Sequence, residues 1–175
     1  RCRERGAGEV YRGGEGSGPA QRTSKESRAG EAGGCGVAGS DPERMYVATR
    51  REYVKGLGTF PGGVYRSDDG GVSWQQVLDD RFADDLAIDP RDAGVVYAGL
   101  SDHPYHDQST GRGIVVSRDG GKNWSSLNGQ GLSCKQISSI TIDPHSPDRL
   151  YLGSGGNGVF VGEVETNPGR KADSR

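Results

Sequence analysis

The chain has 175 residues, of which 31 are glycine, and a formal net charge of −2. Its mean hydropathy is −0.74, and it contains no run of about 18 apolar residues, so a membrane-spanning helix is excluded. The near-neutral charge gives no reason to expect nucleic acid as a partner, and the glycine content argues against a helical bundle. Cys2, Cys35 and Cys134 form no CxxC pair, so we expect no zinc site, no disulfide framework and no cofactor.

The first 36 residues contain no Ile, Leu, Phe, Trp or Met. Such a segment buries too little apolar surface to offset the entropy lost on ordering. We therefore predict that residues 1–36 and the tail 165–175 are disordered and that the folded domain spans residues 37–164. No apolar segment typical of a signal peptide lies near Arg1.

The folded part contains an internal repeat with a period near 50 residues. Three segments begin with Asp-Pro and run into an apolar stretch, namely 41–49, 89–100 and 143–154, and a second short apolar stretch follows each of them, namely 63–67, 113–117 and 158–162. The pattern Ser-x-Asp-x-Gly-x-x-Trp occurs at 67–74 and again at 117–124. Short strands joined by tight turns at this period predict four-stranded antiparallel sheets, the units of a β-propeller.

The Ser-x-Asp-x-Gly-x-x-Trp pattern resembles the Asp-box, or BNR, repeat. With the Asp-Pro strands, residues 41–164 are similar to the Asp-box β-propellers, a superfamily that includes sialidases, xyloglucan-active glycosidases, sortilin-type receptors and photosystem II assembly factors. The resemblance implies that the box is a structural turn rather than a catalytic centre. The residues that match it are Ser67, Asp69, Gly71, Trp74, Ser117, Asp119, Gly121 and Trp124.

We predict an all-β fold, a partial propeller of about two and a half blades. Residues 35–40 make a poor inner strand for the first blade, and the last blade has no box and no fourth strand. Because propellers have about 4–8 blades, the remaining blades would come either from a longer chain or from a homo-oligomer that completes the ring.

Strand alternation places the box turns and Asp-Pro turns on one face and the connections 50–62 and 101–112 on the other. These two connections carry aromatic, cationic, imidazole and carboxylate groups that suit a glycan or a protein ligand, and a solvated loop is the competing interpretation. The candidate ligand-binding residues are Arg51, Tyr53, Lys55, His103, Tyr105, His106 and Asp107. Two histidines in a loop do not fix metal geometry, so we predict no metal site.

An acidic cluster also lies near this second face. Glycoside hydrolysis needs a pair of carboxylates, which makes these four residues candidate catalytic groups, whereas such runs also occur as solvated turns. The candidates are Asp79, Asp80, Asp84 and Asp85. No Arg-Ile-Pro motif is present, so sialidase activity is not implied.

These features favour a non-catalytic propeller module that presents loops for glycan or protein recognition as part of a larger BNR-repeat protein. A fragment of a sialidase-like or xyloglucanase-like glycoside hydrolase is the alternative, and a protein-complex assembly factor is a third class. The resemblance implies an extracellular or periplasmic location.

Overall fold

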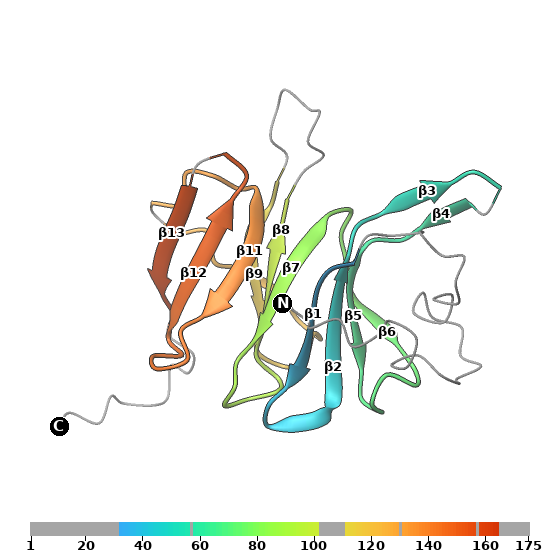
Figure 1. The fold of residues 1–175 in the computed structure, drawn as a ribbon, viewed down its shortest axis with the longest axis horizontal. Helices are drawn as coiled ribbons and strands as arrows, with labels where there is room; N and C mark the ends of the chain where they lie inside the picture. The colour runs from blue at the N-terminus through green and yellow to red at the C-terminus, as the bar shows by residue number, and fades with distance from the viewer. Residues whose placement is uncertain (1–31, 57, 102–110, 130, 157, 165–175) are drawn as a thin grey trace.

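The computed structural model describes residues 32–56, 58–101, 111–129, 131–156 and 158–164. All regular structure in these residues is β-strand, as Figure 1 shows. No helix in the described ranges offers the length and apolarity needed to cross a lipid bilayer. Two sets of predictions concern residues outside the described ranges. They are the disorder predicted for residues 1–31 and 165–175 and the candidate ligand-binding residues His103, Tyr105, His106 and Asp107.

Eleven of the strands form three antiparallel sheets that we number as blades in chain order, and the other two form a separate hairpin described below. Blade 1 has the order β1-β2-β5-β6, with bounds Ala32–Ala38, Asp41–Thr49, Gly63–Ser67 and Gln75–Asp79. Blade 2 has the order β10-β9-β8-β7, with β7 at Ala83–Ile88, β8 at Val96–Leu100, β9 at Gly113–Ser117 and β10 at Ser125–Ser126. Blade 3 has the order β11-β12-β13, with bounds Ile137–Ile142, Arg149–Ser154 and Gly158–Glu163. The prediction of repeated antiparallel blades is confirmed.

The prediction that residues 35–40 make a poor inner strand for the first blade is wrong, because β1 pairs along β2 and begins five residues before the expected boundary at residue 37. Its glycines lie directly against β7 of blade 2. A Cβ atom on Gly36 would lie 2.9 Å from the Ile88 side chain, and one on Gly33 would overlap the Asp84 backbone. The glycines that indicated disorder therefore allow the inner strands of two blades to approach closely.

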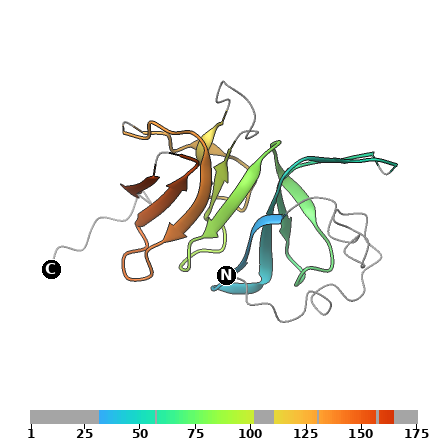
Figure 2. The ribbon, with the colours of Figure 1, turned by 45° about the horizontal axis from the view of Figure 1, so that its top comes forward.

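Two apolar cores lie between successive blades. The first contains Tyr46 and Val64 of blade 1 together with Leu86 and Val96 of blade 2. The second joins blade 2 to blade 3 and includes Tyr97, Ile114, Val116, Ile140, Leu150 and Leu152. The blades are thus held face to face by buried side chains, and Figure 2 shows them side by side.

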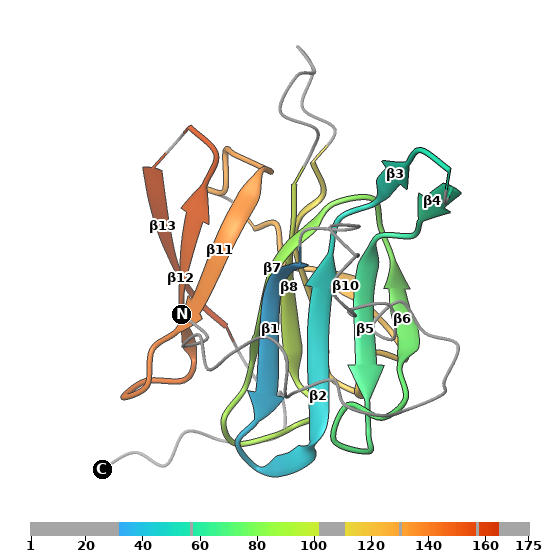
Figure 3. The same cartoon turned by 45° about the vertical axis from the view of Figure 1, so that its right-hand side comes forward.

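The connections between strands divide the molecule into two faces, which Figure 1 shows as its lower and upper edges. The β1–β2, β5–β6, β7–β8, β9–β10 and β11–β12 turns share one edge, which we call the turn face. The β2–β5 and β6–β7 connections reach the opposite edge, which we call the loop face. The segment 50–62, predicted as a loop, instead contains a hairpin of β3 (Glu52–Val54) and β4 (Gly58–Phe60) that projects from blade 1 (Figure 3).

Candidate functional site

The turn at residues 67–74 is closed by hydrogen bonds among its own side chains and backbone groups. Ser67 Oγ donates to Asp69 Oδ1 over 2.7 Å and accepts from the Gly71 N–H over 2.9 Å. Asp69 also accepts from the Ser73 hydroxyl over 2.6 Å and from the Ser73 N–H over 2.8 Å. These hydrogen bonds lower the pKa of Asp69 to about 2, and the bond from the Ser73 hydroxyl is the largest cause.

The turn at residues 117–124 repeats this network. Ser117 Oγ donates to Asp119 over 2.8 Å, and the Asn123 N–H and amide group donate to the same carboxylate over 2.9 and 2.7 Å. The Asn123 N–H is the main cause that lowers the pKa of Asp119 to about 2. Both aspartates are therefore engaged by their own turns, an arrangement that stabilises a backbone reversal.

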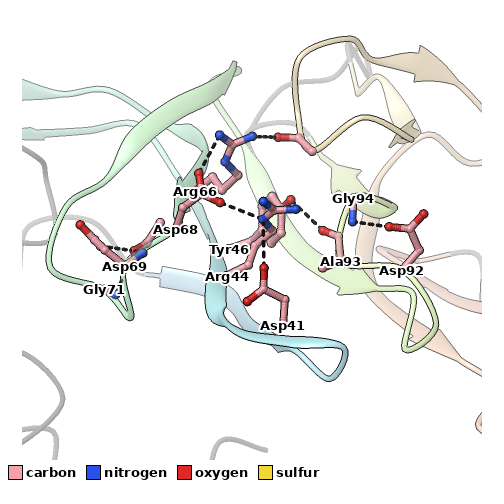
Figure 4. A network of polar contacts seen from close by, with 12 residues as sticks. Asp41, Arg44, Tyr46, Arg66, Asp68, Asp69, Gly71, Asp92, Ala93 and Gly94 are labelled. Atoms are coloured by element: carbon pink, nitrogen blue, oxygen red, sulfur yellow. Dashed lines mark hydrogen bonds and ion pairs between the residues drawn. The ribbon is translucent and has the colours of Figure 1, made fainter.

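The turn face also carries hydrogen bonds from one blade to the next, several of which Figure 4 shows. Tyr46 Oη donates to Ala93 O over 3.0 Å, and the Arg66 guanidinium donates to Gly120 O. In the opposite direction, Trp124 Nε1 donates to Val77 O of blade 1 over 2.8 Å. The sequence indicated the tryptophan but not Tyr46 or Arg66, since contacts between repeats leave no local pattern.

The loop face gathers the four candidate catalytic aspartates around the β6–β7 connection, and arginines engage three of them. Asp84 is buried and forms a two-point ion pair with Arg50, at 2.7 and 2.8 Å. Asp80 accepts from Arg112 over 3.0 Å, and Asp79 lies 3.7 Å from Arg51. Arg50 begins the first long connection, and its pair ties this connection to β7 of blade 2. Arg112 ends the second long connection, and its pair ties this connection to the segment between β6 and β7. Sequence reasoning missed both arginines as partners.

The fourth candidate, Asp85, connects blade 2 to blade 3. Its Oδ2 atom accepts from the Ile140 N–H of β11 over 2.9 Å. Burial raises the pKa of Asp85, while this hydrogen bond acts in the opposite sense. The carboxylate thus pairs a backbone group at the junction of two inner strands.

The projecting hairpin presents the candidate ligand-binding residues of the first long connection. Tyr53 pairs with Thr59 across β3 and β4 and is 70% exposed. Arg51 and Lys55 stand two positions before and after Tyr53 and are also exposed. Arg51 precedes β3 and lies 3.7 Å from Asp79, whereas Lys55 lies in the turn that follows β3, so an exposed ring and an exposed cation stand close together in sequence on this hairpin. Within the described ranges, no group of three or more His, Cys, Asp or Glu residues could hold a metal ion.

Comparison with known proteins finds similarity to a xyloglucanase in sequence and to GH74 enzymes in fold. No family model matches the chain. A xyloglucanase from a Paenibacillus species is 29% identical over 103 residues, which are 59% of this chain and 10% of that protein. The solved structure of a GH74 enzyme from Niastella koreensis superposes with a TM-score of 0.55 at 17% identity, covering 76% of this chain and 21% of that one. An ancestral GH74 enzyme gives a TM-score of 0.54 at 21% identity, covering 79% and 17%.

The chain therefore spans about a fifth or less of the length of these relatives. Its blades have the fold of a glycoside-hydrolase-like β-propeller.

Proposed function

We propose that this chain supplies blades to a xyloglucanase-like β-propeller and that its loop face binds a xyloglucan-type β-glucan. The observation that carries the proposal is the similarity to a xyloglucanase over 103 residues. Those residues exceed half of this chain, and the fold agrees with that of GH74 enzymes. We assign residues 67–74 and 117–124 to the Asp-box type of turn on their repeated hydrogen bonds.

The projecting hairpin has the chemistry that a polysaccharide needs. A sugar ring has apolar C–H faces and a polar hydroxyl edge, and a tyrosine offers an apolar ring with a polar tip. Tyr53 is 70% exposed, so its ring is accessible to a glucan chain. The exposed cations of Arg51 and Lys55, just before and after this strand, would donate to sugar hydroxyls.

The contacts of the acidic cluster favour binding over catalysis for this part of the propeller. A retaining or inverting glycosidase needs one carboxyl group as acid and a second as base or nucleophile. Asp84 forms an ion pair with Arg50, and Asp85 accepts a hydrogen bond from the Ile140 N–H. Asp79 is the most open of the four, with a side chain 73% exposed. An enzyme fragment, in which Asp79 or Asp80 pairs with a carboxylate on another blade, is the alternative that the same similarity supports.

The test is isothermal titration of the full chain with xyloglucan oligosaccharides, with a β-1,3-glucan as the comparison ligand. Tyr53→Ala should weaken xyloglucan binding by about fivefold, because a stacking ring is worth on the order of 1 kcal/mol. Val72→Ala is the matched control, since Val72 is also exposed but lies in the first box turn. Equal affinity for both glucans, or equal losses for both variants, would contradict the proposal.

The enzyme alternative is tested in parallel by the release of reducing ends from xyloglucan. Binding without release supports a recognition surface. Release that Asp79→Asn abolishes, with binding retained, would instead assign a catalytic role to this part of the chain.

A further inference from the structure

Blade 3 exposes apolar positions that blades 1 and 2 bury. We call the side of a blade that meets the next blade its front and the side that meets the preceding blade its back. The third strand of each blade begins with a glycine, and the residue after it is Val64, Ile114 or Val159. These three residues occupy the same position in the strand pairing of their blades. Val64 and Ile114 are at most 2% exposed, whereas Val159 is 72% exposed. Val161 is 60% exposed, and its equivalent Val116 is 1% exposed.

The front of blade 3 nevertheless keeps the pattern of a surface that receives another blade. Tyr151 occupies the register position of Tyr46 and Tyr97. Tyr46 donates to a turn of the next blade, whereas Tyr151 Oη lies 3.2 Å from Asp143 of its own blade. Gly153 is equivalent to Gly99, where a Cβ atom would lie 2.9 Å from the Ile137 side chain of the next blade. At Gly153 the space that a Cβ atom would take is filled by Ser139 Oγ of the neighbouring strand, so the side chains on this surface remain small.

The back of blade 1 is the complementary half of the same kind of contact. Val37 pairs with Met45 just as Ile88 pairs with Val96 in blade 2, where Ile88 and Val96 contribute to the core shared with blade 1. Val37 is 55% exposed. Trp124 donates to a carbonyl of the preceding blade, whereas Trp74 donates within its own turn, to Gly71 O over 3.0 Å. Val37 therefore remains open to solvent on this side, whereas Tyr65, at the position of Val115 in blade 2, is 4% exposed.

We propose that the front of blade 3 binds the back of blade 1 of a second copy of this chain. The two surfaces continue the contact that already joins blade 1 to blade 2 and blade 2 to blade 3, with the same register positions on each side. Burial of Val159, Val161 and Val37 removes apolar surface from water, which drives association. Because the two surfaces differ, copies join head to tail and form a ring or an open series.

The test is sedimentation velocity of the full chain from about 1 to about 300 µM, a range that covers modest protein–protein affinities. The wild type should shift to larger species as its concentration rises. Val161→Glu and Val37→Glu should each raise the dissociation constant by about 30-fold or more, because each places an unpaired charge in the contact. An equimolar mixture of the two variants should form a dimer, since each retains the surface that the other has lost.

Controls separate this geometry from other causes. Thr59→Glu adds the same charge to the exposed hairpin and should leave association unchanged. Circular dichroism must show native sheet content for each variant, and Val159→Lys replaces Val161→Glu if that variant is unfolded. A wild type that stays monomeric overturns the proposal, and so does Val37→Glu or Val161→Glu that still associates with itself. The outcome does not depend on glycan binding.

Discussion

The turn face and the loop face differ in how their polar contacts are built. On the turn face the same bonds recur in two blades, from Ser67 and Ser117 to aspartates two residues later. On the loop face each contact occurs once, and it joins residues far apart in sequence, such as Arg50 with Asp84 and Arg112 with Asp80. Repeated local chemistry marks the scaffold, whereas single long-range contacts shape the surface that distinguishes one propeller from another.

The largest effect should separate the two equivalent tryptophans of the turn face. Trp124 packs against the core between blades 1 and 2 and donates to Val77 O, whereas Trp74 bonds only within its own turn in the described structure. We expect Trp124→Ala to lower the free energy of unfolding by about 2–4 kcal/mol, and Trp74→Ala by about half as much. Urea titration at low protein concentration measures both. Equal losses would show that the bond between blades adds nothing to the box turn.

A smaller difference is expected on the loop face between two of the aspartates that pair with arginines. Asp84→Ala should cost about 1–3 kcal/mol, because Asp84 is buried and bonded at two points, although part of the Arg50 side chain reaches solvent. Asp79→Ala should cost less than about 0.5 kcal/mol, because its partner lies 3.7 Å away and both side chains are exposed. Thermal unfolding of the two variants tests this. A cost for Asp79→Ala as large as that for Asp84→Ala would mean that both pairs hold the connections equally.

The difference between the faces also explains how much the sequence could predict. The box spacing and the Asp-Pro strands predicted the blades, the turns and the division into two faces, because each signal is local and recurs. The arginine partners of the acidic cluster were not predictable, since nothing near Arg50 or Arg112 indicates which of several aspartates lies beside it. The acidic run itself suggested a pair of carboxylates that act together. In the structure three of its aspartates each lie beside a different arginine, and the fourth accepts a hydrogen bond from a backbone N–H.

Strand β1 shows a second limit of sequence reasoning. Composition treats glycine as a residue with nothing to bury, and that logic predicted disorder for residues 1–36. In a propeller the inner strands converge, and Gly33 is needed because any side chain there would overlap the backbone of Asp84 in the next blade. The same composition therefore has opposite meanings in a free tail and in a crowded inner strand.

The smallest effect concerns acid stability, which sharpens the comparison between the two box turns. The pKa values of Asp69 and Asp119 are about 2 in the folded chain against an ordinary value of 3.8. Folding therefore favours the charged carboxylates, and their contribution is fully present above about pH 4 and lost as the pH falls towards 2. The difference in free energy of unfolding between the wild type and Asp69→Asn, or Asp119→Asn, should shrink over this interval. Urea titrations at pH 5, 4, 3 and about 2 would follow it, and a difference that stays constant with pH would contradict the lowered pKa values.

The donor variants distinguish the two turns further. The Ser73 hydroxyl is the main cause of the low pKa of Asp69, whereas the main cause at Asp119 is the Asn123 backbone N–H, which remains after mutation of the side chain. Ser73→Ala should therefore raise the pKa of its aspartate more than Asn123→Ala does, and the acid loss in the first turn should begin at a higher pH. A carboxyl titration followed by nuclear magnetic resonance reports each aspartate separately. A larger shift at Asp119 than at Asp69 would mean that the amide side chain, and not the backbone, holds the second turn.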